Sequence, residues 1–256
     1  MQDPGPNTVE QLIKANELLA AILAAAGAPP PDGGGSPGLT GGGRCQWPVL
    51  FSWSNGGTQP FKKSGDDGYA VGTDYGEAKN LSHDVAIAVT VPSGTGKKAR
   101  MEIGLPMGLN LTPRIQLAWM STHWPTACRI IIELVYDNGT NALTSGITLD
   151  QFDQSLKYRN SAGVYTSLAT KLFNWNPQDW TKADLSVNFA TAKYSYAACN
   201  GSGYDLSAQT IQPLASSTVK RLILTIEIYN SSAEVANYCL LDEILVTDEL
   251  YTGPPA

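Results

Sequence analysis

"KRLILTIEIYN", residues 220–230, carries apolar side chains at regular alternate positions. The apolar positions fall at every second residue: Leu222, Leu224, Ile226 and Ile228. Arg221, Thr225 and Glu227 fall on the opposite set of alternate positions. Successive side chains of a strand point to opposite faces of a sheet. This period of two therefore predicts an antiparallel strand with one face in the core and the other toward solvent.

The same alternation recurs in much of the chain from Cys45 onward. The clearest further strands are "DVAIAVTVP" (84–92), "RIQLAWMS" (114–121) and "CRIIIELVY" (128–136). Weaker candidates bring the expected total to about eight or nine strands. Only "NPQDWTKAD", residues 176–184, predicts a short helix in this region, with Asn176 as its cap. Without long helices between the strands, residues 45–256 are expected to form an all-β domain, an antiparallel β-sandwich or jelly roll.

Composition narrows the classes of partner. Charged residues make up 16% of the 256 residues, and the formal net charge is -6. An acidic chain without a run of Lys and Arg is a poor match for nucleic acid. The four cysteines, Cys45, Cys128, Cys199 and Cys239, lack the close spacing of a zinc site. We expect them to be reduced and to behave as small hydrophobic residues, although three disulfide pairings stay open.

The first 27 residues predict a separate helical segment. Asn7 and Glu10 resemble a capping box, which starts a helix. The following apolar seam, with one polar position, has heptad spacing: Val9, Leu12, Asn16, Leu19 and Leu23. A helix of this length is only marginally stable alone, so we expect it to dock on another protein or to oligomerise. Packing against its own domain is the alternative.

Two other interpretations of this segment fail. The leading residues carry three acidic side chains and only Lys14 as a basic one, whereas a signal peptide begins with positive charge. The uncharged apolar run 18–26 is too short to span a membrane, so no membrane insertion is expected. Residues 28–44 contain seven Gly and four Pro and predict a flexible linker to the domain at 45–256.

The final strand pattern, "NYCLLDEILVTD" at 237–248, contains a conflict. Strict alternation places one set of side chains in the core: Tyr238, Leu240, Asp242, Ile244 and Val246. Burying the Asp242 carboxylate without compensation would be costly. The sequence therefore predicts hydrogen bonds, a cation or a local bulge at Asp242.

Residues 220–249, "KRLILTIEIYNSSAEVANYCLLDEILVTDE", resemble the last two strands of carbohydrate-binding-module jelly rolls of the galactose-binding-like type. The resemblance implies a two-sheet jelly roll that holds glycans with aromatic side chains of its loops or concave face. It also implies that a structural calcium ion can lie near the last strand. Of the calcium ligands only Asp242 can be placed, so no metal site is assigned and no other cofactor is expected.

Aromatic residues near predicted strand ends are the candidate ligand-binding residues: Trp124, Trp175, Trp180 and Tyr204. Exposed aromatic rings stack on sugars and anchor protein interfaces. The only histidines, His83 and His123, have no neighbouring catalytic motif, and the one Gly-x-Ser-x-Gly match, residues 34–38, lies in the Gly- and Pro-rich linker rather than at a strand-to-helix elbow. We therefore expect no enzymatic activity. A glycan-cleaving pair of carboxylates stays an alternative, because only spatial separation defines it.

A β-sandwich of extracellular type without an export signal is typical of virion components. A docking helix, a linker and a distal β-domain resemble the fibre and decoration proteins of tailed bacteriophages. We expect a homo-oligomeric virion adhesion protein that contacts other virion proteins through its N-terminal segment and host surface glycan through the jelly roll. The alternatives are a capsid or neck cement protein that binds no sugar, and a glycan-active enzyme.

Overall fold

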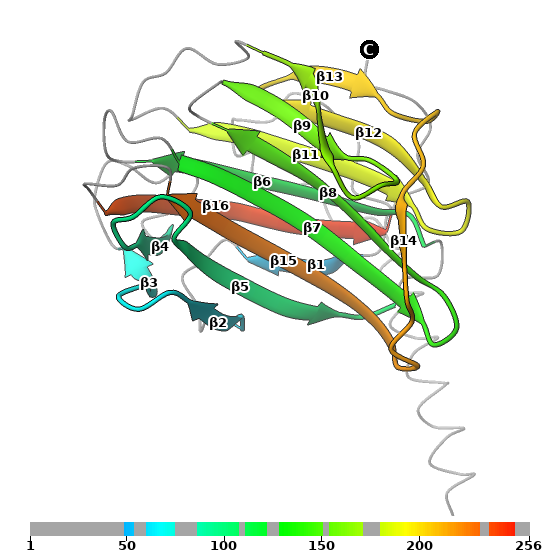
Figure 1. The fold of residues 1–256 in the computed structure, drawn as a ribbon, viewed down its shortest axis with the longest axis horizontal. Helices are drawn as coiled ribbons and strands as arrows, with labels where there is room; N and C mark the ends of the chain where they lie inside the picture. Colours follow the sequence, from blue (N-terminus) through cyan, green and yellow to red (C-terminus); the bar gives the residue numbers. More distant parts are fainter. Residues whose placement is uncertain are drawn as a thin grey trace, which may run out of the picture. The chain divides into compact units, whose positions relative to one another are not determined.

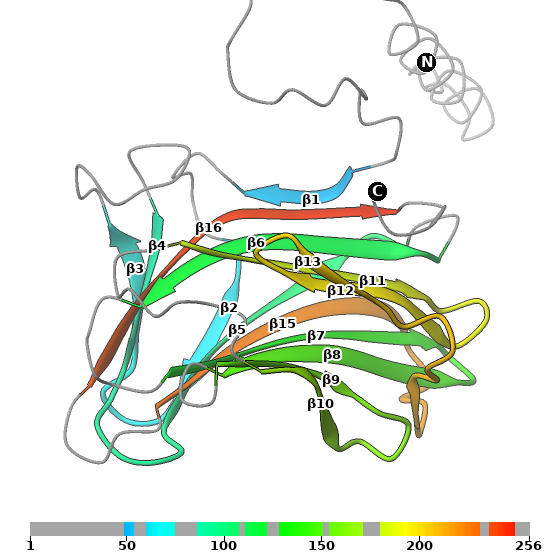
Figure 2. The ribbon, with the colours of Figure 1, turned by 90° about the horizontal axis from the view of Figure 1, so that it is seen from above.

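The computed structural model describes residues 49–53, 60–74, 86–107, 111–121, 128–150, 154–170, 180–230 and 236–248. Within these ranges the chain forms two antiparallel sheets, packed face to face (Figures 1 and 2). The expected all-β class is confirmed, but the strand count was too low, because these ranges hold sixteen strands. The predicted helix in 1–27 and the linker 28–44 lie outside the described residues.

The first sheet, sheet A, has β16 near its middle. Its order is β13 (Ser202–Asp205), β12 (Lys193–Cys199), β11 (Thr181–Asn188), β6 (Pro113–Ser121), β16 (Asn237–Asp248), β4 (Ala86–Val91) and β3 (Ala70–Asp74). The additional strand β1 (Val49–Trp53) pairs with the second half of β16. β4 pairs with the first half, so the two short strands share one edge of β16.

The second sheet, sheet B, has β7 and β15 at its centre. Its order is β10 (Tyr165–Ala169), β9 (Ser155–Arg159), β8 (Ala142–Asp150), β7 (Cys128–Asn138), β15 (Lys220–Asn230), β5 (Lys98–Leu105) and β2 (Lys62–Gly65). β14 (Gln212–Leu214) pairs with β8 beyond the end of β9. Each sheet therefore contains strands from both halves of the sequence, and neither sheet could form from one half alone.

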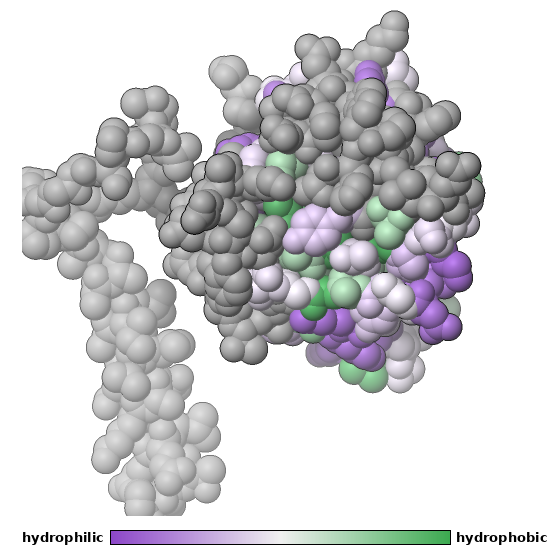
Figure 3. Space-filling model, turned by 90° about the vertical axis from the view of Figure 1, so that its left-hand side faces the viewer, coloured by the Kyte–Doolittle hydropathy of each residue, from purple (hydrophilic) through white to green (hydrophobic). Residues whose placement is uncertain are grey.

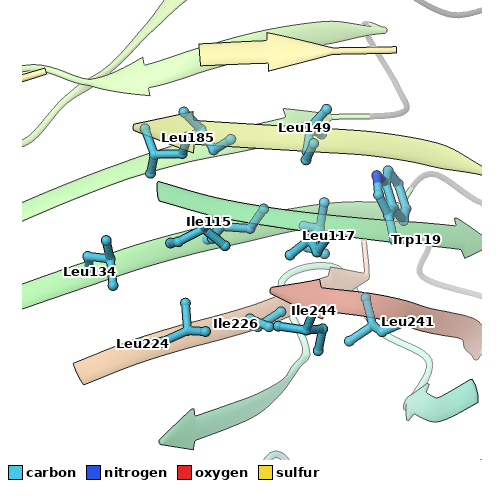
Figure 4. Packing of buried hydrophobic residues seen from close by; sticks show 14 of the residues in the cluster. Ile115, Leu117, Trp119, Leu134, Leu149, Leu185, Leu224, Ile226, Leu241 and Ile244 are labelled. Carbon is cyan, nitrogen blue, oxygen red and sulfur yellow. The ribbon is translucent and has the colours of Figure 1, made fainter. Parts of the chain in front are cut away.

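The core lies between the sheets and follows the period of two. The predicted inward residues of β15 are all buried: Leu222, Leu224, Ile226 and Ile228. In Figure 4, Leu134 and Leu224 of sheet B belong to the same cluster as Ile115, Leu117 and Trp119 of sheet A. Burial of side chains of this size contributes about 1.5–3 kcal/mol each, which makes this layer the main source of stability.

The conflict predicted at Asp242 is resolved by a bulge. The register of β16 shifts between Asp242 and Leu245, and Glu243 adopts a left-handed φ of 50°. The core therefore receives Cys239 and Leu241 before the bulge, and Ile244 and Val246 after it. The strict alternation predicted above is wrong for Tyr238, Leu240 and Asp242, because a bulge inserts one residue and reverses the faces beyond it.

Asp242 thus shares a strand face with Leu240, which packs with Ala86 and Met120 in a cluster separate from the main core. The carboxylate of Asp242 is fully buried, and its Oδ1 accepts a hydrogen bond of 2.8 Å from the backbone N–H of Glu243. The bulge residue Glu243 therefore also donates a hydrogen bond to the buried Asp242 carboxylate.

The helix predicted over 176–184 is wrong for its second half. Thr181 begins β11, which pairs with β6 on one side and β12 on the other. The alternating residues Ala183, Leu185 and Val187 are buried in the core. Hydrogen bonding on both sides and burial of every second side chain outweigh the local preference for a helix after Asn-Pro.

Asp137, at the end of β7, makes stability depend on pH. Its carboxylate accepts hydrogen bonds from the Ser216 hydroxyl (2.6 Å), the Ser217 backbone N–H and hydroxyl (2.7 Å each) and the Gly139 N–H (2.9 Å). These bonds hold the pKa of Asp137 well below its usual range. A lowered pKa stabilises the fold above the unfolded value of about 3.9, and that stabilisation is lost as pH falls further.

We expect Asp137→Asn to lower the melting temperature at pH 7 and to flatten its decline between about pH 4 and pH 2, because the amide cannot titrate there. Thermal melts across this range measure both effects. Asp67→Asn, at an exposed position of the β2–β3 turn, is the matched control. If the melting temperature of Asp137→Asn fell as steeply below about pH 4 as that of the parent protein, Asp137 would not be the source of this pH dependence.

Candidate functional site

The outer face of sheet B, which points away from the core, is the candidate site. Figure 2 shows the long strands of sheet B bowed toward sheet A, so that this outer face is concave. Residues opposite one another in neighbouring antiparallel strands lie on the same face. The register of the sheet therefore identifies which side chains line the outer face.

Basic residues outnumber acidic ones on this face. The basic set is Lys62, Lys98, Arg100, Arg129, Lys157, Arg159 and Arg221, and the acidic set is Glu102, Glu133, Asp137, Asp150 and Glu227. The whole chain, by contrast, has 17 basic and 23 acidic residues. Folding therefore collects positive charge on the outer face of sheet B from a chain that is acidic overall.

Four side chains near one edge form what we term the Arg159 cluster. The Arg159 guanidinium donates from Nη1 to Glu133 Oε1 at 2.8 Å and from Nε to Gln212 Oε1 at 2.6 Å. The Tyr165 hydroxyl also donates to Glu133 Oε1, at 2.8 Å. The guanidinium lies over the Tyr165 ring, 5.7 Å from its centroid. Burial and the Glu133 carboxylate raise the pKa of Tyr165, so its hydroxyl keeps its proton and remains a donor.

Gly146 leaves room on the sheet for two side chains of the Arg159 cluster, Glu133 and Tyr165. It lies opposite Glu133 in the register. A Cβ atom on Gly146 would lie 2.9 Å from Glu133 Cγ and 3.1 Å from the Tyr165 hydroxyl. A side chain at this position would therefore push both groups away. Because Gly146 has no side chain, the Tyr165 hydroxyl and Glu133 can occupy this space.

Tyr194, on β12 of sheet A, supports the cluster from the core side. Its hydroxyl donates to the Arg159 carbonyl at 2.6 Å and accepts from the Gly146 N–H at 3.0 Å. Burial raises the pKa of Tyr194, which keeps this hydroxyl protonated. The backbone beneath the Arg159 cluster is thereby fixed by a side chain that crosses from the opposite sheet.

A second group of charges, the Glu227 cluster, lies on β15 and β5. Glu227 accepts from Arg100 Nη1 at 3.0 Å and from the Tyr229 hydroxyl at 2.7 Å, and Lys98 Nζ lies 3.5 Å away. Arg100 also contacts Glu102 at 2.8 Å. Glu227 would be a costly buried charge without these partners.

The third group joins Asp150 to two cations. Arg129 Nε donates to Asp150 Oδ2 at 2.9 Å, and Lys157 Nζ lies 3.9 Å from the same oxygen. In this pair the Asp150 side chain is only 5% exposed, whereas Arg129 is 44% exposed. In the Glu227 cluster the exposures are 8% for Glu227 and 37% for Arg100. In these two groups the carboxylates lie beneath the cations, whereas Arg159 and Glu133 are similarly exposed, at 24% and 20%.

No known family model and no curated protein matches the chain. Among solved structures, an endo-β-1,4-glucuronan lyase from the fungus Trichoderma reesei is 9% identical, with a TM-score of 0.56 over 79% of this chain and 96% of that chain. A carbohydrate esterase from the Shiga toxin-encoding bacteriophage phi24B is 16% identical, with a TM-score of 0.48 over 80% of this chain and 100% of that chain. Lectin UEA-II, solved with galactose, is 10% identical, with a TM-score of 0.46 over 79% of this chain and 100% of that chain.

The chain has the fold of a two-sheet jelly roll. At these identities the likeness concerns the fold alone, and it confirms the two-sheet jelly roll that residues 220–249 implied. What each of these proteins binds or cleaves is a property of that protein. The chemistry of this jelly roll has to be argued from its own residues.

Of the four predicted aromatic residues the structure describes Trp180 and Tyr204, and it does not bring these two together. Trp180 is half-buried and packs against the Ala86, Met120 and Leu240 cluster, whereas Tyr204 on β13 packs against the main core. The two rings therefore lie on opposite faces of sheet A, and neither lies on sheet B. Trp124 and Trp175 lie outside the described residues, as do all five predicted docking residues, Val9, Leu12, Asn16, Leu19 and Leu23.

The described part of the jelly roll contains no group of three or more His, Cys, Asp or Glu side chains placed to hold a metal ion. The calcium ion implied by the resemblance therefore stays a prediction, with Asp242 its only placed ligand. In the same ranges there is no helix long and apolar enough to cross a membrane.

Proposed function

We propose that this jelly roll is a carbohydrate-binding protein and that its ligand is an acidic glycan, bound on the outer face of sheet B. The observation that carries this proposal is the layering of charge around Asp150 and Glu227, where Arg and Lys side chains lie above buried carboxylates. A ligand approaching the concave surface meets cations first. Carboxylate or sulfate groups of a sugar chain match the paired donors of an arginine.

Neutral parts of such a ligand also find partners on this face. The Arg159 cluster offers the Tyr165 ring and the Gln212 amide beside the guanidinium. Sugar hydroxyl groups accept and donate hydrogen bonds, and sugar faces pack on aromatic rings. The combination of cation, amide and aromatic ring within one cluster is suited to an acidic sugar rather than to a simple anion.

An apolar partner is less well matched to the described surface. Five large hydrophobic residues are exposed among those described, and they are separated in the sequence: Val49, Met107, Val164, Leu214 and Val219. At the end of the molecule in Figure 3, green areas alternate with white and purple ones. This mixed surface supports a polar ligand over the apolar contacts of a cement protein, within the residues that the structure describes.

Binding assays with acidic and neutral oligosaccharides of equal length test this function. We expect the full-length protein to bind the acidic chains, and we expect the affinity to fall as salt rises from about 20 mM to about 500 mM, because salt screens exposed charges. Binding to neutral chains only would overturn the acidic preference. Binding to neither class would overturn the glycan function.

Glycan cleavage is the second candidate. Glu133 opposes Thr225, so Glu227 lies two residues away on the adjacent strand and on the same face. Diagonal neighbours in a sheet are about 7–8 Å apart at their backbones, so two such side chains can bring their carboxyl groups to the roughly 5–9.5 Å separation of glycoside hydrolases. Release of shorter products from the bound oligosaccharide would favour this candidate. Unchanged chain length would favour binding alone.

We further propose that the protein is a virion appendage, homo-oligomeric and held on the particle by its N-terminal segment. The apolar heptad seam in 1–27 and the Gly- and Pro-rich linker support this role. Replacing Leu12 and Leu19 with Glu in the full chain tests it by solution mass and by binding to the particle. An unchanged oligomer that still binds the particle would argue against the docking helix.

A further inference from the structure

We propose that Cys128 and Cys239 form a disulfide that joins the two sheets when the protein meets a disulfide oxidant. This site is independent of the glycan-binding face. Cys128 opens β7 of sheet B, and Cys239 lies in β16 of sheet A. Their sulfur atoms are 3.2 Å apart in the core, and both residues are fully buried.

Neighbouring strands hold both cysteines in place. Cys128 is opposite Asn230 of β15, and Cys239 lies between Val89 of β4 and Ser121 of β6. The sulfur atoms must approach by about 1 Å to reach the bonded length of about 2.05 Å. Side-chain rotation with a small shift of the strand ends covers this distance. The two sheets can therefore keep their packing in the oxidised form.

The oxidant is a low-molecular-weight disulfide such as oxidised glutathione. One cysteine thiolate attacks the oxidant and forms a mixed disulfide, which releases one glutathione thiolate. The second cysteine thiolate then attacks the protein sulfur of the mixed disulfide and releases the other. The protein loses two electrons and two protons, and the oxidant is reduced to two thiols.

Burial controls when this exchange takes place. Burial and the neighbouring Cys239 raise the pKa of the Cys128 thiol, so the folded protein holds little of the reactive thiolate. The oxidant also has no direct path to a buried sulfur. We therefore expect oxidation during folding or during opening of the strand ends, and slow oxidation of the intact fold. A protein folded in a reducing compartment would carry thiols and gain the bond only later.

The bond would close a loop of more than a hundred residues across the sandwich. A crosslink over so long a loop removes much of the conformational freedom of the unfolded chain. We expect the oxidised protein to melt roughly 10 °C above the reduced protein.

The test uses the full-length protein, unfolded in urea and refolded with a mixture of reduced and oxidised glutathione. Free thiols are then alkylated, and non-reduced peptides are mapped by mass spectrometry. We expect a linked peptide pair containing residues 128 and 239, lighter by about 2 Da than the two peptides with free thiols. Cys199→Ala, at a third buried cysteine in β12, should leave the bond intact, and Cys239→Ala should remove it.

Peptide mapping of the unaltered chain keeps the test valid if Cys239→Ala does not fold. Recovery of alkylated Cys128 and Cys239 after oxidative refolding would overturn the proposal. Linkage of either cysteine to Cys199 or Cys45 instead would overturn it as well.

Discussion

Replacing Arg159 with alanine should weaken binding of an acidic oligosaccharide by at least about tenfold while leaving the jelly roll folded. Hydrogen bonds to charged groups contribute about 1.5–3 kcal/mol, which corresponds to roughly a tenfold to hundredfold change in affinity. The substitution also leaves the Glu133 carboxylate without its cation, so an acidic ligand would meet negative charge instead. Titration calorimetry with a uronic acid oligosaccharide measures the loss.

Two further variants separate the role of the guanidinium from that of net charge. Arg159→Lys keeps the charge but replaces the two separate nitrogen donors to Glu133 and Gln212 with a single ammonium, so we expect an intermediate affinity. Lys193→Ala removes one exposed positive charge from β12 of sheet A. It should leave the affinity unchanged. An affinity for Arg159→Ala within twofold of the parent protein, with a normal melt, would place the ligand elsewhere.

The fold was largely predictable because alternation of side chains is a local signal. β7 and β15 bury the residues that a period of two assigns to their inner faces. The errors lie where alternation stops being informative. A bulge at Asp242 reverses the faces of β16, and the carboxylate in the alternating pattern marked a conflict there without deciding between a bulge, hydrogen bonds and a cation. At Thr181, pairing with β6 and β12 decides between strand and helix, and that pairing is not local.

The candidate site was less predictable for a physical reason. Glu133, Arg159, Tyr165 and Gln212 come from four strands and meet only through the order of sheet B. The sequence does mark polar positions in apolar strands, and Glu227 was assigned to the outer face on that ground. It does not show which of these positions become neighbours. Aromatic residues were favoured as ligand contacts, but Trp180 and Tyr204 are partly buried by packing within sheet A.

The register of β7 determines which residues belong to that site, and Leu134→Ala tests it. Leu134 is fully buried at the centre of the core, and its truncation leaves a cavity. We expect the free energy of unfolding to fall by about 3–4 kcal/mol. Val135, the next residue, lies half-buried on the outer face, so Val135→Ala should cost only about 1 kcal/mol. Urea unfolding of both variants, with unchanged m values, measures the difference.

The comparison of these two variants bears on function as well as on stability. A slip of one residue in pairing moves every side chain of a strand to the opposite face. If Val135→Ala cost more than Leu134→Ala, Glu133 and Arg129 would belong to the core side of β7. The charges that cover the outer face would then be absent from it. A larger cost for Leu134→Ala than for Val135→Ala would instead show that Glu133 and Arg129 lie on the concave outer face. An acidic sugar bound to that face would then contact them.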